Sequence, residues 1–246
     1  MEMAHIGNFG LLAMLLLYNL DPFSWGDDDS DETSTPEADD SLPSIALTDD
    51  ADMEIGTDGN DTILALGGDD TVSGGTGDDD IEGNTGDDVI NGEDGNDRIS
   101  GGAGTDTLSG GAGDDVIGVD RLDQAADFTR GGEDNISGGA GNDRLLFGNG
   151  DVVAGDGGLD IFDMVVDTNS NTPTTISDFD PTQDTLTLYL DETADGEAPP
   201  EIDIEVDLDN DLSLVSLNGI QILRLDGVTN LEQDDIQLAN VSALQY

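Results

Sequence analysis

Aspartate recurs at intervals of nine residues through the middle of the chain, from Asp61 to Asp115 without a break. Most of these aspartates follow a glycine-rich turn sequence, and an aliphatic residue stands two positions after each. Carboxylate oxygens are hard ligands of the kind that calcium prefers. A single aspartate in so acidic a chain would most simply be a solvated charge, but a register with glycines at turn positions indicates calcium ligation.

The spacing continues less regularly beyond residue 118. The candidate calcium ligands are Asp61, Asp70, Asp79, Asp88, Asp97, Asp106, Asp115, Asp134, Asp143, Asp151 and Asp160. The register is damaged at Asp134, Asp151 and Asp160, so ligation and simple turn formation explain these three equally well. The residues directly before the periodic aspartates, such as Asn60 and Asp69, are better explained as turn formers than as ligands.

Contiguous nine-residue units cover residues 56–118, and they read GTDGNDTIL, ALGGDDTVS, GGTGDDDIE, GNTGDDVIN, GEDGNDRIS, GGAGTDTLS and GGAGDDVIG. An insertion at 119–130 interrupts the period, and degraded units extend to residue 163. Glycines at the first, second and fourth positions permit positive φ and tight turns. The three residues around the aliphatic position predict a short strand with one side chain facing inward.

Two units would complete one coil, so each unit stacks on the second unit after it, at about 4.8 Å. One file of aspartates then holds Asp61, Asp79, Asp97 and Asp115, and the other holds Asp70, Asp88 and Asp106. Two unit charges at this separation repel by about 0.9 kcal/mol in water and about 3.5 kcal/mol at an effective dielectric of 20. We therefore expect folding to require bound cations.

The overall charge narrows the possible functions. The 246 residues include 58 acidic and 5 basic side chains, for a net charge of −53. Such a chain is not a nucleic-acid-binding protein, and it is poorly suited to anionic lipid. It has no cysteine and one histidine, His5, which excludes disulfides, thiolate metal sites and histidine-based catalytic triads. High charge with few aromatic residues is typical of disorder, unless cations neutralise the carboxylates.

The units GGTGDDDIE, GGAGTDTLS, GGAGDDVIG and GGAGNDRLL fit the pattern G-G-x-G-x-D-x-U-x, in which U is aliphatic. This pattern closely resembles the RTX (haemolysin-type) calcium-binding nonapeptide repeat family. The resemblance implies a parallel β-roll that folds when calcium binds outside the cell. It also implies type I secretion from a Gram-negative bacterium.

The sequence predicts four regions: an N-terminal hydrophobic segment at 1–25, an acidic disordered linker at 26–55, the β-roll at 56–163 and a β-rich capping or secretion region at 164–246. The predicted fold is all-β, a parallel β-roll followed by a small antiparallel β element of about five to seven strands, with a short N-terminal helix and the disordered acidic linker before the roll. Asn218-Gly219 predicts a type I′ hairpin within that element.

The first region contains an apolar run at 6–20. This run is shorter than a membrane-spanning helix, which needs about 20 residues. Three explanations stay open for it: a segment in weak association with a membrane, an atypical export signal, or a short helix packed on the protein. Near the other end of the chain, Asp178, Asp180 and Asp184 could hold a further ion, although a turn cap explains them better.

These features predict a secreted calcium-binding protein with a structural, surface or adhesive role and no catalytic activity. The expected partners are several calcium ions and the type I secretion machinery; a protein or glycan partner is not indicated by the residues. Two alternatives are a calcium-dependent toxin or membrane-active protein that uses residues 6–20, and a secreted enzyme with its site in 164–246. Neither has a motif in its favour, because the chain has no H-E-x-x-H and no G-x-S-x-G.

Overall fold

The computed structural model describes residues 44–118, 132–190 and 200–240. These ranges contain β-strands and one 3-10 helix, η1 (Gln233–Asp235), and no α-helix. No helix within them is long and apolar enough to cross a membrane. The expected N-terminal helix, the apolar run at 6–20 and the insertion at 119–130 lie outside the described residues.

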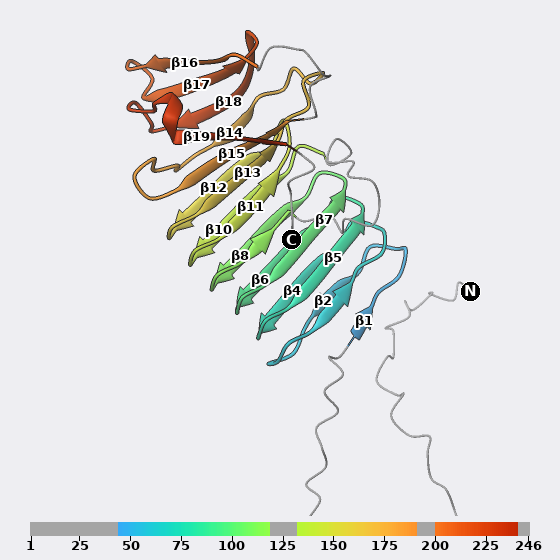
Figure 1. Cartoon of the computed structure of the whole chain (residues 1–246). Coiled ribbons are helices and arrows are strands. Elements are labelled where there is room, and N and C mark those ends of the chain that lie inside the picture. Colours follow the sequence, from blue (N-terminus) through green and yellow to red (C-terminus); the bar gives the residue numbers. More distant parts are fainter. Residues whose placement is uncertain (1–43, 119–131, 191–199, 241–246) are drawn as a thin grey trace, which may run out of the picture. The chain divides into compact units, whose positions relative to one another are not determined.

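The described strands form two sheets (Figure 1). The first sheet holds, in spatial order, β1 (Ser44–Ala46), β3 (Thr62–Leu64), β5 (Asp80–Thr85), β7 (Arg98–Ala103), β9 (Val116–Ile117), β11 (Arg144–Phe147), β13 (Ile161–Val165), β15 (Thr185–Leu190) and β19 (Ile236–Asn240). The second holds β16 (Ile202–Asp207), β17 (Leu212–Leu217), β18 (Ile220–Asp226), β14 (Thr174–Ile176), β12 (Val152–Gly157), β10 (Asn135–Ala140), β8 (Thr107–Ala112), β6 (Val89–Asp94), β4 (Thr71–Thr76) and β2 (Met53–Ile55).

From β1 to β15, successive strands alternate between the two sheets, so the chain winds as a parallel β-roll. Parallel pairing of β5 with β7 places Ile81 beside Ile99, and pairing of β6 with β8 places Ile90 beside Leu108. Each unit therefore stacks on the second unit after it. The all-β fold and the two-unit coil predicted from the nine-residue period are confirmed.

The core of the roll is the pair of aliphatic columns supplied by position eight of the units. The buried column residues are Ile63, Val72, Ile81, Ile90, Ile99, Leu108, Ile117, Ile136, Leu145, Val153 and Phe162. Toward the C-terminal end the core widens, because Phe147, Phe162 and Phe179 pack edge to face with ring centroids 6.4 and 5.7 Å apart. Along most of the array, each rung has one inward side chain per sheet.

The roll begins earlier than the sequence indicated. Strands β1 and β2 lie within the 26–55 region that we predicted to be a disordered linker; its residues 26–43 lie outside the described part. Residues 47–55 (LTDDADMEI) are a degraded unit, with Asp52 nine residues before Asp61 and half-buried Glu54 beside Val72 of the core column. Because Glu54 stands at the position that is aliphatic in the other units, the nine-residue pattern did not indicate this unit.

The C-terminal region is only partly antiparallel. Strands β14, β15, β18 and β19 continue the two parallel sheets. The antiparallel element consists of β16, β17 and β18. Asn218 and Gly219 connect β17 to β18 with φ values of 51° and 79°, as the predicted type I′ turn requires.

Candidate calcium site

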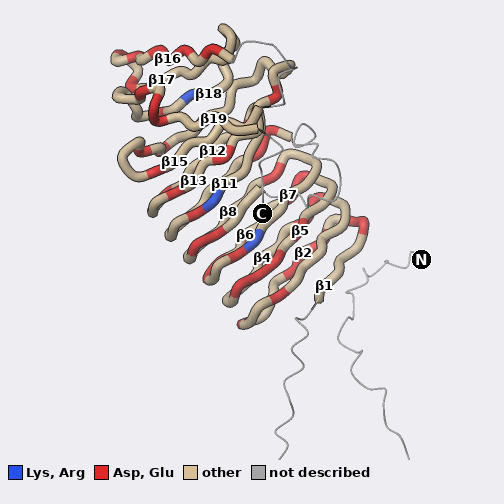
Figure 2. The backbone as a smooth tube through the Cα atoms, viewed as in Figure 1, with Lys and Arg blue, Asp and Glu red and all other residues tan. Residues whose placement is uncertain are grey.

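The periodic aspartates lie at the ends of the turns that lead into the strands, and nearly all are buried. The side chains with at most 4% exposure are Asp61, Asp70, Asp79, Asp88, Asp97, Asp106, Asp115, Asp143, Asp151 and Asp160. Asp134 is half-buried. Figure 2 shows how acidic positions recur along the successive rungs.

The two predicted files are present, one on each side of the roll, and both continue past the insertion. The file that enters the first sheet holds Asp61, Asp79, Asp97, Asp115, Asp143 and Asp160, and the file that enters the second holds Asp70, Asp88, Asp106, Asp134 and Asp151. Asp115 lies next to Asp143 although 28 residues separate them, so the extra residues of the insertion leave the register of the roll intact.

One oxygen of each carboxylate joins neighbouring rungs. The backbone N–H of Asp79 donates to Oδ1 of Asp97 over 2.8 Å, and that of Asp97 donates to Oδ1 of Asp115 over 2.8 Å. The same bond recurs along both files at 2.7 to 3.1 Å. The carboxylate of the aspartate at position six is therefore a hydrogen-bond acceptor that joins rungs, in addition to being a charged group.

The other oxygen of the interior carboxylates has no hydrogen-bond partner although it is buried. Within the described residues, this is true of Oδ2 in Asp70, Asp79, Asp88, Asp97, Asp106, Asp115 and Asp143. A buried charged oxygen without a partner costs several kcal/mol unless something neutralises it. These seven atoms need a cation or a proton.

In the regular units other than that of Asp70, which begins with Ala65, the first residue is a glycine that leaves the space beside this oxygen. A Cβ at Gly92 would lie against Oδ2 of Asp97 and 2.6 Å from the carbonyl oxygen of Gly110 on the next rung. A Cβ at Gly74 would likewise meet Oδ2 of Asp79 and, at 2.8 Å, the carbonyl oxygen of Gly92. Each such turn is a cradle lined by a carboxylate oxygen and by backbone carbonyl oxygens.

A comparison with protein-family models identifies the repeat. The model for the RTX calcium-binding nonapeptide repeat, four copies long, matches residues 55–90, 82–117 and 128–154. These residues are RTX calcium-binding repeats. The matched segments contain both aspartate files from Asp61 to Asp151.

One solved structure, the AlgE6R3 subunit of the Azotobacter vinelandii mannuronan C5-epimerase, is similar over 85% of each chain at 20% identity with a TM-score of 0.23. No curated protein matches the chain.

Calcium fits the donor set of the RTX turns. Calcium takes six to eight oxygen ligands, and it accepts both carboxylates and backbone carbonyls. In the described part of the chain, no three carboxylate or imidazole side chains are grouped so that they alone could hold a metal ion. An ion in these turns would therefore take few carboxylates and draw its other ligands from the glycine carbonyls. The residues that would hold it are the interior aspartates and the glycines of position one.

The pKa values of the periodic aspartates are raised, as expected for buried carboxylates without a counter-charge. Burial raises the pKa of Asp97 and Asp106 to about 6 and that of Asp115 and Asp134 to about 7. The N–H bond from the preceding rung lowers each of these pKa values, and the neighbouring carboxylates of the files raise them again. Burial likewise raises the pKa of Asp143 to about 6. A bound cation would reverse this effect.

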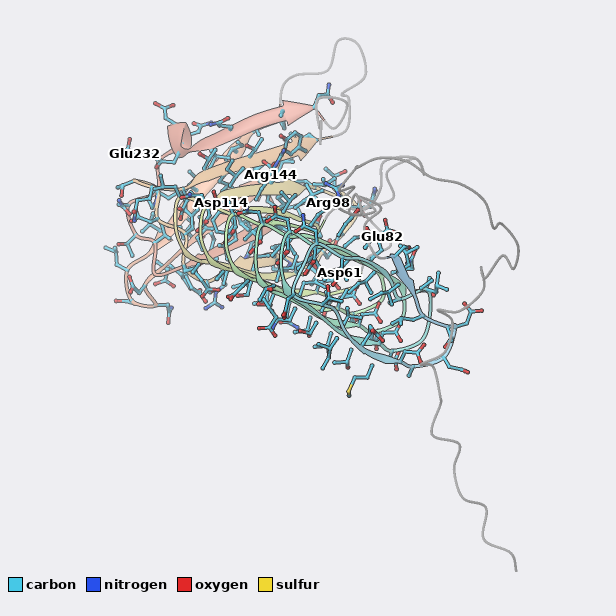
Figure 3. The ribbon with its side chains drawn as sticks, turned by 90° about the horizontal axis from the view of Figure 1, so that it is seen from below. Asp61, Glu82, Arg98, Asp114, Arg144 and Glu232 are labelled. Carbon is cyan, nitrogen blue, oxygen red and sulfur yellow. The ribbon has the colours of Figure 1, made fainter. Side chains whose placement is uncertain are left out.

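The residues at position five have a different task, as the sequence suggested. Asn60 accepts the N–H of Asp78 over 2.9 Å, Asp78 accepts that of Asn96 over 2.9 Å, and Asn96 accepts that of Asp114 over 2.8 Å. In these bonds the N–H of the later rung donates to a side chain of the earlier rung, whereas in the position-six bonds the N–H of the earlier rung donates to the carboxylate of the later rung. Asp114 is labelled in Figure 3 beside the roll, and Asp61 lies nearer its beginning. Position five therefore forms turns and joins rungs.

Two file members escaped the sequence reasoning in part. The N–H of Asp52 donates to Oδ1 of Asp70 over 2.7 Å, so Asp52 is the first member of the second file among the described residues. Asp184 accepts the N–H of Asp160 over 3.1 Å and ends the first file. Asp180 instead holds a local turn through Thr182 at 2.9 Å, as expected for a turn cap.

Proposed function

We propose that this protein is a secreted, extracellular calcium-binding protein whose RTX roll folds when calcium enters the turns. The ions serve as folding cofactors, and the folded roll has a structural, surface or adhesive role without catalysis. Type I secretion from a Gram-negative cell is part of the proposal, since the resemblance to RTX proteins implies it. The protein or glycan that the folded roll contacts is left unspecified.

The observation that carries the proposal is the set of seven buried carboxylate oxygens without partners. Ionised at neutral pH, they oppose folding, because each is desolvated and stands close to a like charge on the next rung. Calcium that binds only the folded roll would add its binding free energy to the stability of that state. An affinity on the order of 10⁻⁴ to 10⁻³ M, as in extracellular modules, would keep the chain unfolded before export.

A non-catalytic role is supported by the C-terminal region. Residues 164–246 contain no His, Cys or Lys, which leaves few residue types for acid–base or nucleophilic chemistry. Their described strands complete the sheets of the roll and add the β16–β18 element. For the membrane-active alternative, calcium-dependent leakage of liposomes by the full chain would be the deciding result.

The test is circular dichroism of the full chain during calcium titration. Calcium-free protein at pH 7.5 should lack the β signal, and millimolar calcium should produce it together with a large rise in melting temperature. Magnesium at equal ionic strength is the control, because it requires a tighter octahedral shell that backbone carbonyls seldom supply. A full β signal in calcium-free protein, or an equal response to magnesium, would refute the proposal.

A further inference from the structure

The turns of the roll divide into two kinds according to the second oxygen of their aspartate. In the interior turns Oδ2 is free, as described above. In the turn of Asp61, Oδ2 accepts the N–H of Thr57 over 2.5 Å and its hydroxyl over 2.9 Å. In the turn of Asp52, Oδ2 accepts the N–H of Thr48 over 2.9 Å and its hydroxyl over 2.6 Å. These two aspartates are capped at Oδ2 from within their own turns, whereas Oδ1 of Asp61 is buried without a partner.

The backbone at position two separates the two kinds. Every turn with a free Oδ2 has positive φ there: Leu66, Gly75, Asn84, Glu93, Gly102, Gly111 and Gly139, with values from 73° to 115°. Thr48 and Thr57 occupy the same position in their units and do not have positive φ. Their N–H groups point at the carboxylate instead.

Stereochemistry explains the difference. A β-branched residue with positive φ is a genuine outlier, whereas glycine adopts it freely and asparagine adopts it more readily than most residues. Threonine at position two therefore holds the turn in the conformation that sends its N–H to Oδ2. The threonine hydroxyl adds a second donor to the same oxygen.

The short unit at residues 147–154 supports the rule independently. It lacks one residue of the period, and Gly148 at its position two is without positive φ. The N–H of Gly148 donates to Oδ2 of Asp151 over 2.8 Å. Here the shortened turn, rather than a β-branched side chain, removes the positive φ, and the carboxylate oxygen is again occupied.

We propose that the conformation at position two decides which turns take calcium, and that Thr48 and Thr57 make the first two turns of the roll ion-free caps. The inference rests on the proposed function, because it assigns calcium to the turns with a free Oδ2. It adds that the Asp61 turn is excluded although its aspartate is buried and in register, and that Asp151 is excluded for the same reason.

The test counts calcium ions per chain by native mass spectrometry of the full protein at saturating calcium. Thr57→Gly restores the G-G-x-G-x-D pattern and should add one ion. Thr57→Val keeps a β-branched side chain, which disfavours positive φ, but removes the hydroxyl, so this variant should bind no additional ion. Thr57 is exposed, so neither change disturbs the core.

The converse pair is made at Asn84, whose φ is 73°. Asn84→Thr should remove one ion from the Asp88 turn, whereas Asn84→Gly should leave the count unchanged. If wild-type protein binds calcium but Thr57→Gly and Asn84→Thr both bind the same number of ions as wild type, the conformation at position two does not decide which turns take calcium. If wild-type protein binds no calcium, the proposed function itself fails.

Discussion

The backbone N–H of Asp97 donates to Oδ1 of Asp115 over 2.8 Å, while Oδ2 of Asp115 is buried without a partner. One side chain thus has two separate tasks. Its first oxygen joins two rungs, and its second oxygen is available to a cation. This division allows the structural and the metal-binding contribution of an aspartate to be measured separately.

Asp97→Asn should separate them, because an asparagine oxygen can still accept the N–H of Asp79 but carries no charge. The variant should bind one calcium ion fewer. At pH 5, below the pKa of about 6 of Asp97 and where we expect the calcium-free roll to fold, its calcium-free form should be at least as stable as wild type. Asp97→Ala should also lose the ion, and it should further lose about 1 to 3 kcal/mol because the Asp79 N–H is left unsatisfied. Native mass spectrometry and urea unfolding measure the two effects. Equal unfolding midpoints for the two variants would contradict the division.

The raised pKa values predict a pH-dependent fold in the absence of calcium. The pKa of Asp115 and Asp134 is about 7 in the folded roll, against about 3.9 for an unfolded aspartate. A raised folded pKa contributes stability that is complete below the unfolded pKa and is lost as pH rises through the folded pKa. The calcium-free roll should therefore lose stability between about pH 4 and pH 7.

Circular dichroism of calcium-depleted protein checks this expectation. The β signal should be greater at pH 5 than at pH 7.5, and pH 5 lies above the pI of about 4.1, where the protein would be least soluble. With millimolar calcium the signal should persist at pH 7.5. A calcium-free fold that is more stable at pH 7.5 than at pH 5 would show that the buried carboxylates are not the groups that oppose folding.

Much of this architecture could be predicted from sequence, because each rung requires a glycine-containing turn and an inward aliphatic residue, and both lie within one nine-residue unit. Glycine at the turn positions and an aliphatic residue such as Ile90 recur in every regular unit, so the period gives the coil, the files and the core. Asp52 was missed because Glu54 stands where the aliphatic residue should be. The self-capped state of Asp61 was missed because it depends on the φ of Thr57, which a pattern of residue types does not display.

The glycine of position one should be required for space. Gly92→Ala would place a methyl group against Oδ2 of Asp97 and the Gly110 carbonyl, where the ion is proposed to bind. We expect the calcium midpoint for folding to rise tenfold or more, which corresponds to about 1.4 kcal/mol or more. Gly59→Ala is the matched control, since a Cβ there meets nothing within 4 Å and its φ is not positive. If both variants titrate like wild type, the cradle is not the binding site.

Ile90 tests whether the rungs depend on one another. Its side chain is 1% exposed and lies between Val72 and Leu108 in the aliphatic column of its sheet. Ile90→Ala should cost about 2 to 5 kcal/mol and Ile90→Val about 0.5 to 1.5 kcal/mol in unfolding free energy at saturating calcium. Ile90→Asp should prevent calcium-induced folding, because a charge would be buried without a partner.

Thr107→Ala, at an exposed position of β8, is the control and should change the unfolding free energy by less than about 0.5 kcal/mol. Because each rung is stabilised by its neighbours, Ile90→Ala should also raise the calcium midpoint, although residue 90 provides no ligand. Calcium titrations followed by circular dichroism compare the two variants directly. An Ile90→Ala protein that folds at the wild-type calcium midpoint would mean that the ions alone hold the rungs together, without help from the apolar column.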